Sequence, residues 1–150
     1  MRAVIQRVSE ASVTIGADVV GRIGTGLLVL VGVEAGDTPA AADWLAGKVT
    51  QMRIFPDDAG KMNRSVTEAA GGLLVISQFT LIASTAKGNR PSFIEAARPE
   101  EAVPLYELFL AAAESLVGRR PERGVFAADM KVALVNDGPV TIVIDTRRRE

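Results

Sequence analysis

The pattern of apolar and polar positions predicts a mixed α/β chain. Gly16-Ala17-Asp18 is typical of a turn between two short antiparallel strands. The continuous apolar runs 27–31 and 73–76 predict central strands that are covered on both faces. The segments with strand-forming character are 2–8, 12–15, 19–23, 27–31, 73–76, 130–135 and 140–144. The stretch 53–55 also predicts extended structure, followed by a loop at 56–60.

Two further segments carry apolar residues at the 3.6-residue spacing of a helix. Thr38-Pro39 predicts an N-cap followed by proline in the first helical turn, and a second helix is expected from Pro99 to a stop at Gly118. The predicted buried faces are Ala42, Leu45, Ala46, Val49 and Met52 in the first helix, and Leu105, Leu108, Phe109, Ala112 and Leu116 in the second. We expect the first helix to pack on the sheet.

The segments 26–30 and 72–76 resemble each other, and each precedes a loop and a helix with proline near its start. This similarity leaves open a degenerate internal duplication of β-β-α-β units. No linker or low-complexity segment divides the chain, so we expect one domain over residues 1–150.

Composition narrows the chemistry. The chain has 48% apolar residues, enough for a core, and it contains no cysteine and no histidine. Disulfides, Ser-His-Asp triads, Cys-His pairs and most transition-metal sites are therefore excluded. We expect no metal and no cofactor. The N-terminal stretch 1–7 carries charges inside a short apolar segment, which predicts neither a signal peptide nor a membrane span and favours a cytoplasmic protein.

The formal net charge of -1 gives no global basic field. We therefore expect no membrane partner and no DNA duplex as a partner. The local basic clusters are Arg119-Arg120 and Arg147 to Arg149. These arginines are either solvated or in contact with phosphates.

Three polar loops are candidates for chemistry. Ser77-Gln78-Phe79-Thr80, at the end of an apolar strand, offers hydroxyls, an amide and backbone N–H groups that could stabilise an oxyanion. The alternative is a strand that continues through Phe79 and Thr80. The stretch 85–93 is either a solvated loop or a phosphate-contacting lip.

The third loop is Asn136-Asp137-Gly138-Pro139-Val140-Thr141. Alone, it predicts a hairpin turn between the last two strands. Proline has no N–H, so the Gly138-Pro139 peptide presents carbonyl acceptors without a competing donor, and such a bond can be cis. This loop could receive an ammonium group.

Together these motifs resemble the D-aminoacyl-tRNA deacylases, whose signatures read Ser-Gln-Phe-Thr and Asn-X-Gly-Pro-X-Thr. Both are present without departure. The likeness extends over nearly the whole chain through Ile5-Gln6-Arg7-Val8, Gly60-Lys61-Met62-Asn63, Arg90-Pro91-Ser92-Phe93 and Phe126-Ala127-Ala128-Asp129-Met130. The resemblance implies a compact, barrel-like β-sheet with two packed helices, a homodimer, and the aminoacylated acceptor end of tRNA as partner.

The resemblance also implies residue roles. Ser77, Gln78, Phe79 and Thr80 would be catalytic. A cis Gly138-Pro139 peptide would enter the other subunit's site and face the substrate's α-ammonium group, so that an L side chain collides while D residues and glycine are accepted. Arg7 would brace this loop, unless it is a surface arginine. Asn136 and Thr141 would complete the substrate-binding loop, with Phe126 and Met130 near the terminal adenosine unless they pack in the core.

Without histidine, two mechanisms remain. In the first, water attacks the ester with help from the ribose 2′-hydroxyl, and backbone N–H groups around Gln78 and Phe79 hold the oxyanion. In the second, Thr80 is a nucleophile activated by Lys87, Asp129 or another carboxylate. Two other functions stay open: a non-catalytic module that binds the tRNA end, and an esterase for small molecules.

Overall fold

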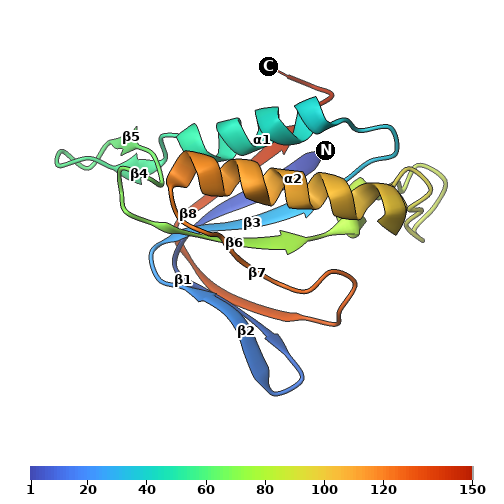
Figure 1. Cartoon of the computed structure of the whole chain (residues 1–150), viewed down its shortest axis with the longest axis horizontal. Coiled ribbons are helices and arrows are strands. Elements are labelled where there is room, and N and C mark those ends of the chain that lie inside the picture. The colour runs from blue at the N-terminus through green and yellow to red at the C-terminus, as the bar shows by residue number, and fades with distance from the viewer. Residues whose placement is uncertain (150) are drawn as a thin grey trace.

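The computed structural model describes residues 1–149, which form two α-helices, one 3-10 helix and eight strands (Figure 1). The strands are β1 (Arg2–Ile15), β2 (Asp18–Ile23), β3 (Gly26–Gly32), β4 (Phe55–Pro56), β5 (Met62–Arg64), β6 (Gly72–Ser77), β7 (Glu122–Arg123) and β8 (Lys131–Asp145). The helices are α1 (Pro39–Gln51), the 3-10 helix η1 (Phe79–Ile82) and α2 (Pro99–Val117). Within residues 1–149, no helix is both long and apolar enough to cross a membrane.

Strand β1 is the centre of the main sheet. One edge of β1 pairs antiparallel with β3 and then with β2, and the other edge pairs with β8. Strands β3, β6 and β7 run parallel, giving the path β2-β1-β3-β6-β7. The ends of this path approach each other, since a Cβ atom on Gly21 of β2 would lie 3.1 Å from the Arg123 carbonyl oxygen of β7. The predicted barrel-like sheet is therefore confirmed, and it is nearly closed.

Both helices lie side by side on one face of the sheet, as Figure 1 shows. The larger core fills the space between the two helices and the sheet. In it, Leu45, Val49 and Phe109 are fully buried against Val29 and Val75 of the central strands. A smaller core occupies the opposite face, inside the curl of the sheet. Its members are Val8, Ala11, Val13, Ile23, Leu28, Leu74 and Ile76.

The helix ends follow the sequence signals. The Thr38 hydroxyl accepts a hydrogen bond from the Ala41 N–H at 3.3 Å, and Gly118 ends α2 with a φ of 74°. Met52 lies just beyond α1. The predicted face of α2 is rotated, because Leu108 and Leu116 are exposed. The buried stripe is instead Ala102, Leu105, Tyr106, Phe109, Leu110 and Ala113, since α2 packs on α1 as well as on the sheet.

Two strand predictions are wrong. The segments 2–8 and 12–15 form one strand, β1, and the segments 130–135 and 140–144 form one strand, β8. Asn136-Asp137-Gly138-Pro139 is therefore an irregularity inside β8 rather than a hairpin. The reason is that both halves of β8 pair with β1, which is long enough to hold them in line despite register shifts near Val8.

The two similar segments 26–30 and 72–76 are partners in the sheet. They pair parallel and in register, from Gly26 opposite Gly72 to Leu30 opposite Ile76. A Cβ atom on Gly26 would collide with the Gly72 backbone, so glycine is required for this close approach. The internal duplication itself stays a prediction.

Candidate active site

The Ser77-Gln78-Phe79-Thr80 motif lies where β6 leaves the sheet. Ser77 is the last residue of β6, and the Gln78 N–H continues the pairing by donating to the Val31 carbonyl at 2.8 Å. The chain then turns into η1, where the Leu81 N–H donates to the Gln78 carbonyl at 3.2 Å. Phe79 and Thr80 are exposed as a result. The alternative of a continuing strand is therefore wrong.

The hydroxyl of Thr80 accepts a hydrogen bond from the side-chain amide of Gln78. Within residues 1–149, no carboxylate or lysine is hydrogen-bonded to this hydroxyl. Asp129, one of the bases considered above, instead pairs with Lys131 at 3.1 Å on the surface. Nor do the described residues contain a group of three or more Asp and Glu side chains that could hold a metal ion.

Phe126 and Met130 lie at the same end of the sheet as this motif. Strand β7 is parallel to β6, with Val75 opposite Arg123, so the loop after β7 emerges at the level of Ser77. The Gly124 N–H extends the ladder to the Val75 carbonyl at 3.3 Å. Met130 packs beside Gly124 against the smaller core, and Phe126 is half-buried against the larger one.

The second motif is fixed by its own asparagine. The Asn136 Oδ1 accepts from the Val140 N–H at 2.8 Å, and the Asn136 Nδ2 donates to the Thr141 hydroxyl at 3.1 Å. Gln6 of β1 donates to the same hydroxyl at 3.3 Å. The Gly138-Pro139 peptide between them is cis, and both residues are exposed.

Arg7 fixes the position of the second motif through two hydrogen bonds. Its Nε donates to the Asp137 carbonyl at 2.8 Å, and its Nη1 donates to the Ile54 carbonyl at 2.5 Å. The side chain therefore ties the loop to the segment that follows α1. A free surface arginine, the alternative from sequence, is not what the structure contains.

The two motifs of one chain lie far apart. Ser77 is opposite Val31, Val31 is opposite Ala3, and the second motif borders β1 at positions 6–8. From Ser77, three strand spacings of about 4.8 Å and about four residues of about 3.3 Å lead to the second motif. Leu81 of η1 lies closer to β1, because it accepts a hydrogen bond from Arg2, so the separation of roughly 13 Å along the strands is what keeps the two motifs apart. A small substrate group cannot touch both motifs of the same chain.

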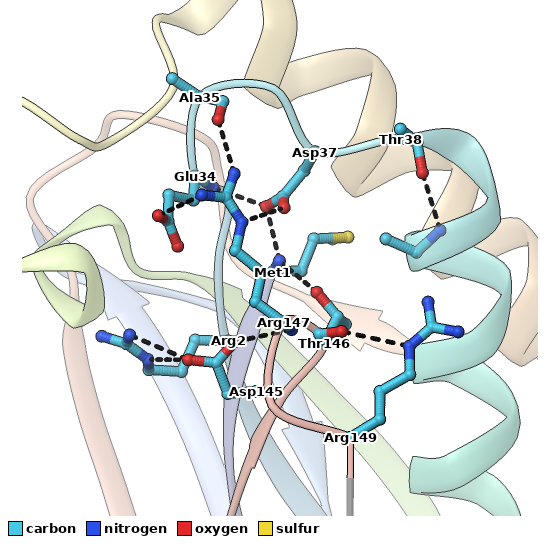
Figure 2. A network of polar contacts seen from close by, with 11 residues as sticks. Met1, Arg2, Glu34, Ala35, Asp37, Thr38, Asp145, Thr146, Arg147 and Arg149 are labelled. Atoms are coloured by element: carbon cyan, nitrogen blue, oxygen red, sulfur yellow. Dashed lines mark hydrogen bonds and ion pairs between the residues drawn. The ribbon is translucent and has the colours of Figure 1, made fainter.

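Arg2 anchors the first motif, although no sequence pattern pointed to it. Its Nη1 donates to the Leu81 carbonyl of η1 at 2.5 Å, and its Nε and Nη2 donate to Asp145 at 3.2 and 3.0 Å. Figure 2 shows the pair of Arg2 and Asp145. Burial raises the pKa of Asp145, but the Arg147 N–H and the Arg2 guanidinium outweigh it, so this pKa lies below its usual value.

A second part of this network holds the chain ends to the loop before α1 (Figure 2). The Met1 ammonium group contacts Asp37 at 2.5 Å and donates to the Thr146 hydroxyl at 2.6 Å. Arg147 contacts Glu34 at 2.5 Å and donates to the Ala35 carbonyl at 2.6 Å.

Other arginines of the two basic clusters also have partners within the chain. Arg149 lies 4.6 Å from the ring centroid of Trp44, and Arg119 donates to the Gly71 carbonyl. Arg119, Arg147 and Arg149 have these internal contacts and are also exposed, so phosphate contact by the two clusters stays a prediction.

Comparison with known proteins decides the family. The model of the D-Tyr-tRNA(Tyr) deacylase family matches residues 4–145. The chain belongs to this family. D-aminoacyl-tRNA deacylases of Opitutus terrae and Akkermansia muciniphila are 62% and 61% identical to it over 150 residues, which is all of this chain and all of each relative.

Two solved structures share the fold of this chain. A structure named c-Myc DNA Unwinding Element Binding Protein is 39% identical, with a TM-score of 0.90 over 97% of this chain and 98% of that one. A probable eukaryotic D-amino acid tRNA deacylase superposes with a TM-score of 0.82 over 95% of this chain and 97% of that one. At 17% identity, the second match supports the fold alone.

Proposed function

We propose that this protein hydrolyses the ester bond of D-aminoacyl-tRNA and releases the free D-amino acid and tRNA. The observation that carries the proposal is the presence of both motifs on a chain that matches relatives of this name over their full length. The structure of each motif also supports this proposal. The first is exposed at the end of β6, and the second is fixed by Arg7 and Asn136.

The proposed active site forms between two copies of the chain. Roughly 13 Å along the strands separates the motifs within one chain, which is too far for one aminoacyl group to contact both. Arg7 fixes the position of the second motif through the Asp137 carbonyl, and the Gly138-Pro139 peptide itself is exposed, so a second molecule can contact it. A homodimer in which this peptide faces the partner's η1 would complete the site.

Selection of D residues would then depend on backbone atoms. The Gly138 and Pro139 carbonyls would accept hydrogen bonds from the substrate's α-ammonium group, which fixes the amino acid in one orientation. In this orientation an L side chain would collide with the peptide, while a D side chain points outward. Glycine has no side chain, so glycyl-tRNA should also be hydrolysed.

For the chemical step, we infer that water attacks the ester with help from the ribose 2′-hydroxyl. Thr80 has an amide as its neighbour rather than a base, which argues against its activation as a nucleophile. The Gln78 N–H is already bonded to Val31, so the Phe79 N–H is the better oxyanion donor. Phe126 and Met130 flank this end of the sheet, where the terminal adenosine would bind.

The decisive experiment compares release of tyrosine from D-tyrosyl-tRNA and L-tyrosyl-tRNA by the purified protein. We expect rapid turnover of the D ester and little of the L ester. Binding without turnover would identify a tRNA-end binding module instead. Equal activity on simple esters that lack a nucleotide would identify a small-molecule esterase.

The 39% identical structure is named for binding a DNA element. For this chain, the net charge of -1 argues against a DNA duplex as ligand. A gel-shift titration with duplex DNA tests this point. We expect no shift at protein concentrations that saturate tRNA.

A further inference from the structure

Phe79 and Phe93 form an aromatic pair beside the first motif. Their ring centroids are 5.1 Å apart with an interplanar angle of 72°. The Phe79 side chain is 56% exposed, and Ile94, the residue after Phe93, is 90% exposed. Phe93 is half-buried, so this edge-to-face pair is open to solvent mainly through Phe79, and its remaining free ring surface can contact a ligand.

Phe93 lies at the base of a short hairpin. The Ser84 N–H donates to the Ser92 carbonyl at 2.9 Å, and the Ser92 N–H donates back to the Ser84 carbonyl at 2.8 Å. Residues 85–91 therefore form a projecting tip, which lies beyond the N-terminal end of α2 in Figure 1. Because η1 leads directly into this hairpin, the tip, Phe93 and Thr80 share one end of the molecule.

The hairpin carries a net positive charge, whereas the whole chain does not. Residues 83–94 contain Lys87 and Arg90 and no acidic residue, whereas the whole chain has a net charge of -1. Both side chains are exposed. Exposed aromatic rings next to positive charges are the combination that binds single-stranded nucleic acid, since bases stack on the rings and phosphates pair with the charges.

We propose that this hairpin binds the single-stranded nucleotides of tRNA that precede the terminal adenosine. A base stacks on Phe93, and Lys87 and Arg90 contact the phosphates. The proposal rests on the function proposed above, because Thr80 and Phe79 place the esterified adenosine at the foot of the hairpin. The preceding nucleotides then leave the site along the tip.

The test compares two substrates that share the reacting ester. One is D-tyrosyl-tRNA, and the other is D-tyrosyl adenosine, which lacks the preceding nucleotides. In the Lys87→Ala/Arg90→Ala protein, and separately in Phe93→Leu, we expect kcat/KM to fall about tenfold on the tRNA. On the adenosine ester, kcat/KM should stay within about twofold, a bound set by the absence of any stacked base or phosphate contact.

Salt provides an independent readout. Two phosphate contacts to a single strand contribute roughly 1.4 to the slope of log(kcat/KM) against log salt concentration. On tRNA, the slope measured for the double variant should be smaller in magnitude by this amount. A matched control is Arg22→Ala/Lys61→Ala, which removes two exposed positive charges away from the hairpin and should keep the slope.

Each outcome decides between explanations. Equal losses on both substrates would overturn the proposal, because Phe93 would then act only through η1. Unchanged kcat/KM on tRNA in both variants would also overturn it, as would a changed molecular mass by analytical ultracentrifugation, which would make the hairpin an interface between protein chains. If the unmodified protein hydrolyses neither ester, the proposed function itself fails.

Discussion

The Nε of Arg7 donates a 2.8 Å hydrogen bond to the carbonyl oxygen of Asp137, the residue before the exposed Gly138-Pro139 peptide. The same guanidinium donates to the Ile54 carbonyl, so one planar group links the loop to the segment that follows α1. Loss of a hydrogen bond from a charged donor costs about 1.5–3 kcal/mol. The loop therefore depends on a residue that lies outside the 136–141 motif.

Arg7→Met should reduce both turnover and chiral selection. We expect kcat/KM on D-tyrosyl-tRNA to fall roughly tenfold to a hundredfold, by the free energy of one such bond. The ratio of D to L hydrolysis should fall as well, because a loose loop rejects L residues less well. Arg22→Met, an exposed arginine on β2, is the control. If Arg7→Met keeps the D to L ratio, the bracing role is refuted.

Gly138 should tolerate no side chain. Its φ is 151°, which L residues rarely adopt, and an added Cβ would lie 2.8 Å from the Val140 nitrogen. Gly138→Ala should lower the free energy of unfolding by about 1–2 kcal/mol and abolish D-selective turnover. Gly16→Ala, at a φ of 59° with no atom within 4 Å, is a comparison variant that measures a positive-φ cost without a clash. Urea unfolding and the tRNA assay measure both effects.

Thr80→Ala separates the two mechanisms. The only partner found for its hydroxyl in residues 1–149 is the Gln78 amide, so we expect kcat to fall less than about tenfold, as for the loss of one neutral hydrogen bond. A tRNA that ends in 2′-deoxyadenosine should lose most of its turnover. Near-complete loss of kcat in Thr80→Ala, with normal turnover of the deoxy substrate, would establish Thr80 as the nucleophile.

Local signals in the sequence predicted local structure well. Thr38-Pro39 and Gly118 placed helix ends because caps depend on neighbouring residues alone. The buried face of α2 was harder to predict, since apolar residues lie on both candidate stripes. Tyr106 lies on the buried stripe, where its hydroxyl is satisfied by donating to the Val75 carbonyl at 3.0 Å. This partner is 31 positions away in the sequence.

The arrangement of the candidate site depends on long-range pairing. Asn136 to Pro139 has the composition of a hairpin turn, and only the length of β1 keeps both halves of β8 in line. Likewise, Arg2 and Leu81 are 79 positions apart, and no local pattern predicts that a guanidinium in the first strand supports η1, which carries Thr80. The motifs identified the residues, but the register of β1 determines which of them meet.

The pair of Arg2 and Asp145 should make the free energy of unfolding depend on pH in the acidic range. The pKa of Asp145 is lower in the folded chain than its usual value. Its stabilising effect is therefore complete above the unfolded pKa of about 3.9 and is lost as the pH falls through the folded pKa. Asp145→Asn should cost about 1 kcal/mol at pH 7, and the difference from the unmodified protein should shrink below about pH 4. Asp129→Asn, whose side chain is 90% exposed, should change little at either pH. Urea unfolding from pH 7 to pH 3 measures the difference, and a gap that stays constant over this range would show that Asp145 stabilises the fold without its charge.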